Sequence, residues 1–175
     1  MPTIFAHAVV PLAIAAAAGR ARISPKLAIA GAVLAIVPDF DVVSFRLGID
    51  YADIWGHRGA THSLVFAALS AAVVALLWRE ARSFIGWIFL ALSMASHGLL
   101  DTLTDGGLGA ALWWPFSEAR VFAPLTPVRV SPIGAGFFSA RGLETVLSEL
   151  RWIVLPCLAL ALAGWLVRRA APART

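Results

Sequence analysis

The apolar residues of this chain gather in five runs that are separated by shorter polar segments. The runs predict helices at about residues 4–19, 27–43, 62–78, 84–103 and 145–168. None shows the alternation of apolar and polar positions that is typical of a half-buried strand. Lipid offers no water to unpaired backbone groups, so apolar runs in a membrane are expected to be helical. The pattern predicts an all-α, multi-pass transmembrane bundle of about five helices, with residues 1–175 forming a single membrane domain.

The composition indicates that lipid is the solvent of this bundle. Hydrophobic residues make up 60% of the chain and charged residues only 14%, whereas a soluble domain carries about 25% charged residues. Several runs are shorter than the roughly 20 residues that cross a bilayer, so flanking residues must extend them or some are re-entrant. The chain starts without the basic segment of a cleavable signal peptide, so we expect the first run to stay in the protein.

The basic residues predict how the bundle is oriented. Three linkers carry Arg20, Arg22 and Lys26; Arg79 and Arg82; and Arg168, Arg169 and Arg174. These linkers alternate along the chain and therefore lie on one side, which the positive-inside rule makes cytoplasmic. The N-terminus is then outside and the C-terminus inside. We expect a location in the bacterial inner membrane, with a long loop rich in Pro, Gly and Trp on the extracytoplasmic side.

The net charge of +4 is accounted for by these linkers and does not predict nucleic-acid binding. No segment combines a basic stripe with aromatic stacking residues. The expected partners are the lipid bilayer and an amphiphilic substrate, and the oligomeric state is left open. Cys157, the only cysteine, lies inside an apolar run and is expected to be a small buried hydrophobic residue.

All four histidines and all six aspartates fall on or near the side opposite the basic linkers. His97 and Asp101 are four residues apart near the end of the fourth run, so they share one helical face and could share an ion. A His–Asp hydrogen bond that fixes helix packing is the alternative. Ionisable residues near membrane depth more often mark a functional site, which favours the first interpretation.

Asp39 and Asp41 follow Pro38 in the second run. Residues two apart on an α-helix point to nearly opposite faces, so both could face one site only if the helix ends there. Proline weakens a helix, and unwound backbone is tolerated where it lines a polar cavity. A helix terminus with two solvated acids is an equally good interpretation of this segment alone.

The densest polar cluster is His57-Arg58-Gly59-Ala60-Thr61-His62-Ser63. We expect Thr61 to cap the third helix, with His62 in its first turn and His57 in the loop before it. A polar interfacial loop is the alternative. Arg58 could bind an anion bidentately, or it could form a salt bridge to one of the aspartates.

Together with His7 at the outer start of the first helix, these segments form one candidate metal site. Its candidate ligands are His7, Asp39, Asp41, His57, His62, His97 and Asp101. Mixed nitrogen and oxygen ligands suit zinc, and also manganese or iron. Seven candidates exceed the three ligands of one catalytic zinc, so one or two ions, or one ion with a general base, fit this set.

In their order along the chain, these motifs resemble the bacterial membrane-bound metal-dependent hydrolases, a family that includes LexA-regulated inner-membrane members. The resemblance rests on His7, the Pro38–Asp41 element, the His57–Ser63 element and the Ser96–Thr104 element. Trp114-Pro115-Phe116 also fits the family pattern, and the likeness covers roughly residues 1–135. It implies that the seven candidate ligands form the metal site, and it supplies no proven substrate.

The ligand order is also similar, more faintly, to zinc-dependent phospholipase C. Those enzymes have later histidine ligands, and here no histidine follows His97, so a trinuclear site is not expected. The leading hypothesis is hydrolysis of a phosphoester or ester in a lipid or lipid-linked substrate. Asp39 or Asp41 would be the base, and Arg58 would bind the anionic head group.

Two other classes of protein are alternatives to this hypothesis. A metal-binding protein or transporter without enzymatic activity would place its ligands near mid-bilayer, whereas here they gather at one face. Lipid phosphatases that use a catalytic histidine without metal require an arginine six residues before the histidine of an HxxxD motif, and position 91 is alanine.

Overall fold

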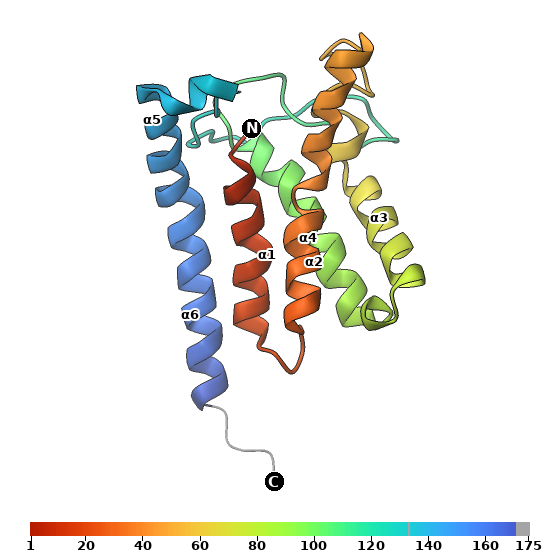
Figure 1. Ribbon diagram of the computed structural model, residues 1–175, viewed down its shortest axis with the longest axis vertical. Coiled ribbons are helices and arrows are strands. Elements are labelled where there is room, and N and C mark those ends of the chain that lie inside the picture. Colours follow the sequence, from red (N-terminus) through yellow and green to blue (C-terminus); the bar gives the residue numbers. More distant parts are fainter. Residues whose placement is uncertain (133, 171–175) are drawn as a thin grey trace.

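The computed structural model describes residues 1–132 and 134–170, and this part of the chain is helical (Figure 1). Its α-helices are α1 (Ile4–Ala18), α2 (Pro25–Leu34), α3 (Leu64–Leu77), α4 (Phe84–Thr102), α5 (Ala140–Glu149) and α6 (Leu155–Ala170). A π-helical segment, η5 (Leu150–Val154), joins α5 to α6, so these three elements follow one another without a break. The 3-10 helices are η1 (Val37–Leu47), η2 (Ala60–His62), η3 (Arg79–Ala81) and η4 (Gly134–Phe138).

The second apolar run departs most from the prediction of one helix over residues 27–43. Its α-helical part ends at Leu34, and an eleven-residue 3-10 helix, η1, follows. Pro38 lies in the first turn of η1, where its missing N–H and its ring oppose continuation of the α-helix. Runs of 3-10 helix longer than three or four residues are uncommon, and η1 carries both Asp39 and Asp41.

The third helix begins later than expected. Ser63 is its N-cap, and the Ser63 hydroxyl accepts a hydrogen bond from the Phe66 backbone N–H at 3.0 Å. The prediction that Thr61 caps this helix is therefore wrong. Thr61 cannot serve because the 3-10 helix η2 still occupies residues 60–62, and its hydroxyl bonds elsewhere.

The last helical segment is longer than the predicted range of 145–168, because it begins at Ala140 and reaches Ala170. Within the described residues, isolated bridges join Thr104 to Val128 and Ala110 to Val121. Both bridges pair residues of the segment 121–128 with residues that follow α4.

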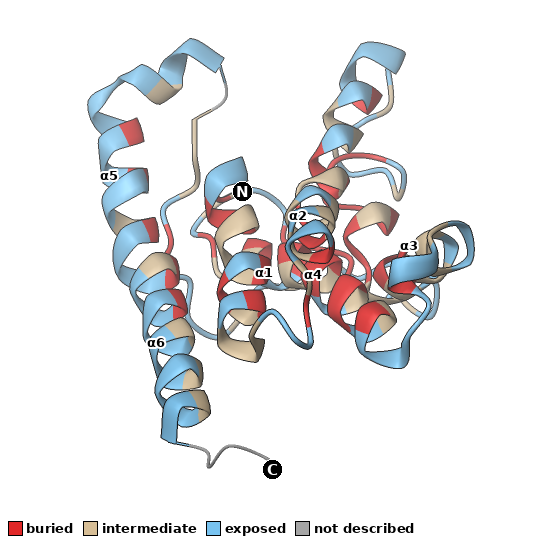
Figure 2. Cartoon of the chain, turned by 60° about the horizontal axis from the view of Figure 1, so that its bottom comes forward, coloured by how far each residue is buried: buried red, intermediate tan, exposed pale blue. Residues whose placement is uncertain are grey.

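The apolar content of the helices agrees with a membrane bundle. Three segments are long and apolar enough to cross a bilayer: Pro25–Leu47, Phe84–Thr102 and Ala140–Ala170. The helices α1 and α3 are apolar but shorter. Figure 2 shows that buried residues concentrate where α1, α2 and α4 meet, whereas most of α5 and α6 is exposed. On α6, for example, Leu158 and Leu162 are exposed, which suits a helix that faces lipid.

The helix α6 packs along α1 (Figure 1). A Cβ atom on Gly164 would lie only 2.5 Å from the Cα atom of Ala17, so glycine lets the two helices approach closely, as small residues do in membranes. Near the other end of this contact, the Glu149 carboxylate accepts hydrogen bonds from the backbone N–H and the hydroxyl of Thr3. Cys157 is buried in an apolar cluster with Ala6, Ala13 and Ile153, between α1 and the last helical segment. This confirms the prediction that it is a small buried hydrophobic residue.

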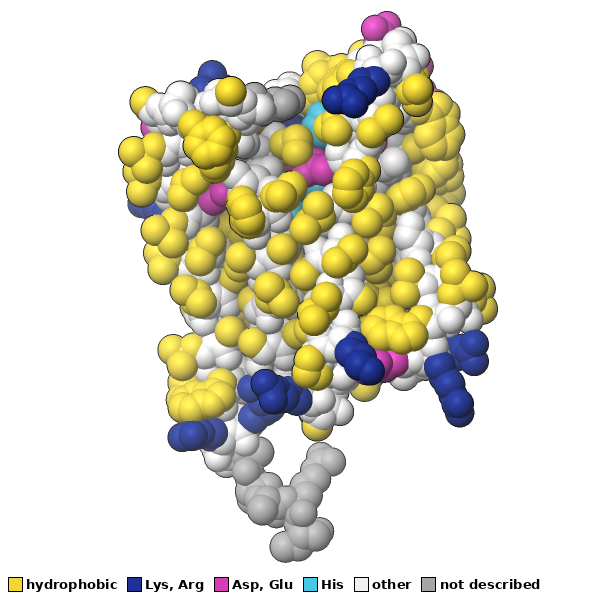
Figure 3. Space-filling model, viewed as in Figure 1, with side chains coloured by type: hydrophobic (Ala, Val, Ile, Leu, Met, Phe, Trp, Pro, Cys, Tyr) yellow, Lys and Arg dark blue, Asp and Glu magenta, His cyan; other side chains and the backbone are white. Residues whose placement is uncertain are grey.

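The two ends of the molecule differ in polarity. The α1–α2 and α3–α4 linkers lie at the end where α6 finishes, and Figure 3 shows Lys and Arg side chains concentrated there. The sides between the ends are covered mainly by hydrophobic side chains. The N-terminus, η1 and η2 lie toward the opposite end, and this is the end at which the candidate ligands meet.

Candidate metal centre

The helix α4 provides two residues of the site from its buried face. His97 and Asp101 are fully buried, and their Nε2 and Oδ2 atoms lie 3.9 Å apart. The Nδ1 atom of His97 lies 2.7 Å from the Ala35 carbonyl oxygen. Because a carbonyl can only accept, Nδ1 carries the proton and Nε2 presents its lone pair to the site, which is the tautomer that a metal ligand requires.

The 3-10 helix η1 brings in Asp39. Residues two apart are about 160° apart around an α-helix but only about 120° apart around a 3-10 helix. This geometry allows Asp39 and Asp41 to reach two adjoining parts of one site. The Oδ1 atom of Asp39 lies 3.3 Å from His97 Nε2, and Asp39 is almost fully buried.

The fourth residue, His62, comes from η2. Its Nε2 atom lies 3.0 Å from His97 Nε2 and 3.2 Å from Asp101 Oδ2. A Cβ atom on residue 98 would lie 2.2 Å from the His62 carbonyl oxygen, so only glycine at this position of α4 lets η2 approach so closely. Asp39, His62, His97 and Asp101 are all buried, and their candidate ligand atoms lie within 4.8 Å of one another. We call these four residues the central cluster.

The carboxylates of the central cluster are poorly satisfied. Neither oxygen of Asp39 has a hydrogen-bond partner among the described residues, and the same holds for Asp101 Oδ1. Asp101 Oδ2 lies 3.1 Å from Arg58 Nε and 3.2 Å from His62 Nε2. Buried anions are costly unless they are paired or coordinate a metal. Two imidazole nitrogens and two carboxylate oxygens at close range are a donor set that suits tetrahedral zinc.

Asp41 is satisfied much more fully. Its Oδ1 atom lies 2.6 Å from His57 Nδ1, and its Oδ2 atom accepts hydrogen bonds from the Thr61 hydroxyl at 2.8 Å and the Arg58 backbone N–H at 3.1 Å. Oδ2 is also 3.2 Å from His62 Nδ1. Asp41, His57 and His62 can form a second group of metal ligands, but the same contacts position the His62 imidazole from behind.

Arg58 is fully buried, and its guanidinium contacts the protein rather than open space. Its Nε atom lies 3.1 Å from Asp101 Oδ2, one terminal nitrogen donates to the Gly106 carbonyl, and the other donates to the Thr104 hydroxyl. The structure thus places Arg58 in a salt bridge to an aspartate, one of the two arrangements that the sequence allowed. All three nitrogens of the Arg58 guanidinium therefore have protein partners, and none is available for a substrate anion.

His7 lies beside the central cluster. Its ring stacks on that of His97 with centroids 3.7 Å apart, and its Nε2 atom is 3.8 Å from Asp101 Oδ1. His7 is fully buried, and neither ring nitrogen has a hydrogen-bond partner among the described residues. All seven ligands named from the sequence therefore lie in one neighbourhood, His7 and His57 at its edges.

Sequence reasoning missed Arg120 as a residue that shapes the site. Its guanidinium donates to the backbone carbonyls of His57, Tyr51 and Asp53 at 2.7–2.8 Å, and so fixes the loop that carries His57. Arg120 stands outside any motif in the sequence. Its partners are main-chain carbonyls, which the identity of the side chains does not reveal, so the sequence shows no sign of its role.

The protonation of His62 reflects these surroundings. Burial lowers the pKa of His62, but hydrogen bonds with Asp101 and Asp41 outweigh burial and raise that pKa to about 9. At neutral pH without a metal ion, the imidazole thus carries a proton between the two carboxylates. A divalent cation could replace this proton.

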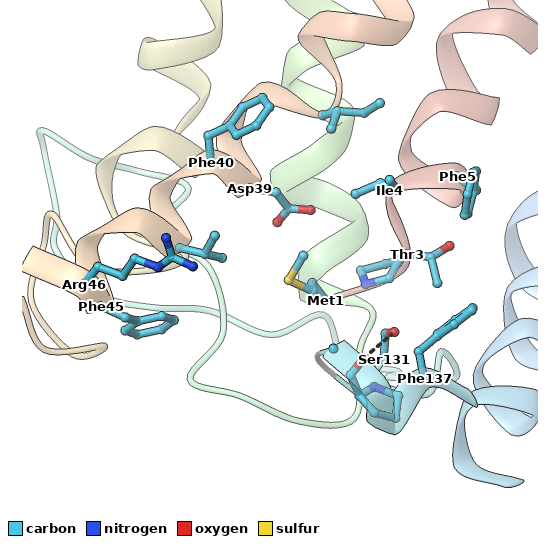
Figure 4. A pocket seen from close by; sticks show the side chains of 15 residues that line it. Met1, Thr3, Ile4, Phe5, Asp39, Phe40, Phe45, Arg46, Ser131 and Phe137 are labelled. Carbon is cyan, nitrogen blue, oxygen red and sulfur yellow. Dashed lines mark hydrogen bonds between the residues drawn. The ribbon is translucent and has the colours of Figure 1, made fainter. Parts of the chain in front are cut away.

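A cavity of about 680 Å³ adjoins the central cluster. It is bounded by the start of α1, by η1 and by η4, and its lining is mainly apolar. Figure 4 shows the Asp39 carboxylate directed into it from η1. The site is therefore open toward a space of the size that small ligands occupy, roughly 300–1,000 Å³.

Comparisons with known proteins place the chain among inner-membrane proteins. The model of the family described as "YdjM inner membrane protein" matches residues 1–172. "Inner membrane protein YbcI" of Escherichia coli (strain K12) is 42% identical over 173 residues, which cover 97% of this chain and 100% of that protein. No solved structure matches the chain.

Proposed function

We propose that this chain, which belongs to the YdjM inner membrane protein family, is a membrane-embedded, metal-dependent hydrolase with its site in the central cluster. The observation that carries this proposal is the buried cluster itself: two imidazole nitrogens lie beside two carboxylates, and neither Asp39 oxygen nor Asp101 Oδ1 has a hydrogen-bond partner among the described residues. Buried carboxylates of this kind are costly unless they are paired or coordinate a metal ion.

His62, His97 and Asp101 of the central cluster would hold one divalent ion and leave a position for water, with zinc favoured by this donor set and manganese or iron as further candidates. A bound divalent cation lowers the pKa of a coordinated water and polarises a phosphoryl or carbonyl oxygen. Asp41 and His57 would then hold the His62 imidazole from behind, because carboxylates that orient metal-binding histidines are a recurring feature of such sites. A second ion at Asp41, His57 and His62 would have to share His62 with the first.

The contacts distinguish the two candidate bases. Asp41 already binds His57, Thr61 and the Arg58 backbone, whereas Asp39 faces the cavity with neither oxygen hydrogen-bonded. Asp39 is therefore the residue placed to hold and deprotonate a water on the cavity side. Arg58 acts on Asp101 by keeping its carboxylate in position.

The substrate class follows from the location of the site. The site adjoins an apolar cavity at one end of a membrane bundle, which suits an ester or phosphoester of a lipid or lipid-linked molecule. The distribution of basic linkers at the other end supports an extracytoplasmic location for the site. A metal-binding membrane protein or a transporter is the alternative class.

Metal analysis of the purified protein tests the site. We expect about one zinc per chain in the wild type and strong loss of zinc in Asp101→Asn, which preserves shape and removes one charge. Asp50→Asn is the matched control, because Asp50 is exposed and lies outside the cluster. Full metal content in a folded Asp101→Asn protein would show that the site is assigned wrongly.

Activity is tested on lipids in detergent micelles. Chelated protein is reloaded with zinc, manganese or iron, incubated with a bacterial lipid extract, and the products are identified by mass spectrometry. We expect metal-dependent release of a head group or an acyl chain, and no release by Asp39→Asn. Metal binding without any hydrolysis would favour the alternative class.

A further inference from the structure

The cavity beside Asp39 has a regular wall formed by one face of η1. Ile36, Asp39, Val42 and Phe45 all line the cavity and are spaced three residues apart. Since a 3-10 helix has three residues per turn, positions 39, 42 and 45 stack along η1 and Ile36 precedes its first turn. This wall places one acidic side chain in a strip of apolar side chains.

The opposite walls are also apolar. Ile4 and Phe5 of α1 and Phe137 of η4 line the cavity together with η1 (Figure 4). Figure 3 shows acidic and histidine side chains within a hollow on the face that is otherwise covered by hydrophobic side chains. The hollow therefore opens sideways, toward the surface that lipid would cover.

The lining of the cavity also includes a guanidinium that the site itself does not use. Arg46 lines the cavity from η1 on the same side as Asp39 (Figure 4). Arg46 is exposed, and it forms no ion pair with any described residue. Arg58, in contrast, is committed to Asp101 and Thr104.

From these observations we infer that the cavity binds an anionic lipid drawn sideways from the bilayer, with its acyl chain along the η1 wall and its phosphate at Arg46. The cavity is mainly apolar, and its lining includes the guanidinium of Arg46, which forms no ion pair with a described residue. It therefore complements such a lipid in both shape and charge. This inference rests on the proposed function, because it places the ester of the bound lipid next to Asp39. It assigns head-group recognition to Arg46 instead of Arg58.

Lipid binding in neutral detergent, followed by native mass spectrometry, tests this assignment. The probes are phosphatidic acid and phosphatidylcholine with identical acyl chains. We expect Arg46→Gln to weaken phosphatidic acid binding by about five- to tenfold, the loss of one charge-assisted contact, and to change phosphatidylcholine binding by less than about twofold. Arg141→Gln, an exposed arginine of α5 outside this cavity, is the control and should change neither.

A second pair of variants tests the chain-binding part of the cavity. Phe137→Asp places a charge in the apolar wall and should weaken binding of both lipids. Phe138→Asp is the matched control, because the neighbouring Phe138 is 89% exposed and does not line the cavity. Equal effects of these two variants, or an unchanged affinity of Arg46→Gln for phosphatidic acid, would overturn the inference.

The metal content of the same samples separates this inference from the proposed function. Arg46→Gln should retain wild-type metal content, because Arg46 does not touch the central cluster. With chelated wild-type protein, the charge of Asp39 opposes the phosphate, so phosphatidic acid should bind more weakly than to the zinc-loaded protein. A wild type that holds no zinc but still shows the Arg46 effect would support the lipid site and reject the hydrolase.

Discussion

Asp39 and Asp41 are two residues apart in the sequence, yet their surroundings give them different tasks. Asp41 has protein partners on both carboxylate oxygens, whereas Asp39 has no hydrogen-bond partner among the described residues and faces the cavity. The sequence alone could not assign different roles to the two aspartates, because both follow the same proline and carry the same charge. The distinction depends on η2 and the loop before it, because His57, Arg58 and Thr61 hydrogen-bond to Asp41 and not to Asp39.

Replacing Asp41 with asparagine should weaken metal binding without abolishing it. The amide cannot accept hydrogen bonds from His57, Thr61 and the Arg58 backbone in the same way, so the His62 imidazole loses its orientation. Loss of such a supporting carboxylate lowers metal affinity by about 10- to 100-fold. Zinc titration with a competing chelator measures this change; an affinity equal to that of Asp50→Asn would contradict the role of Asp41.

The raised pKa of His62 predicts how metal binding depends on pH. In the metal-free protein this pKa is about 9, so at pH 7 the ion must displace a proton from His62. Zinc affinity should therefore rise by about tenfold per pH unit up to pH 9. In the metal-free form the protonated His62 stabilises the fold below its unfolded pKa of about 6.5, and that contribution is lost as the pH rises toward 9.

Calorimetry in buffers with different ionisation enthalpies would count the protons released. Release of about one proton per zinc ion at pH 7 is the expected result. The metal-free protein should melt at a lower temperature at pH 9 than at pH 6, and the zinc-loaded protein should not follow this trend. Zinc binding that does not vary with pH would show that His62 is not a ligand.

At the scale of elements, the site depends on how closely η2 approaches α4. Gly98 faces the His62 carbonyl, so the backbone of η2 rests on a position of α4 that has no side chain. The sequence shows Gly98 only as a glycine inside a helix, where glycine is slightly unfavourable. Its role becomes visible only when η2, much earlier in the chain, is packed against it.

The substitution Gly98→Ala should therefore lower both stability and metal affinity. An added Cβ would lie 2.2 Å from the His62 oxygen, so η2 must shift; overpacking of this kind costs about 1–3 kcal/mol. Helix propensity alone predicts the opposite, a gain of up to about 1 kcal/mol. Thermal melting and zinc titration measure the two effects, with Gly136→Ala as control because its nearest neighbour would be 3.2 Å away. A more stable Gly98→Ala protein would argue against this packing.

Hydrophobic runs predicted the element types well and their ends less well. Apolar composition is enough to indicate helices in lipid, and the ranges expected for the first and fourth helices nearly match α1 and α4. The second run could not be resolved, because a 3-10 helix and an α-helix share the same apolar residues and differ only in hydrogen bonding. The seven candidate ligands lie in one neighbourhood, and whether they bind a metal stays a prediction. The contacts of Arg58 and Arg120 could not be predicted, because their partners are distant in sequence.

At the scale of the whole molecule, the bundle separates a basic end from an end that holds the candidate site (Figure 3). The positive-inside rule predicts which end faces the cytoplasm. Cysteine labelling in intact cells tests that orientation with Glu118→Cys, in the segment after α4, and Arg79→Cys, in the linker between α3 and α4; both positions are exposed. An impermeant maleimide should label only Glu118→Cys, and the native Cys157 is buried. Labelling of Arg79→Cys alone would reverse the topology.

The brevity of α1 and α3 has a consequence for the surrounding lipid. Their 15 and 14 residues extend only about 21–22 Å, against a hydrocarbon thickness of about 30 Å. Such hydrophobic mismatch is relieved by thinning the bilayer beside the short helices, and α1 forms one wall of the cavity. Lipids there would already sit displaced from their usual depth, so extraction into the cavity would need less work. Turnover in vesicles should then be faster with long-chain than with short-chain host lipids, because the mismatch is larger in the thicker bilayer. Equal rates would show that mismatch does not assist substrate capture.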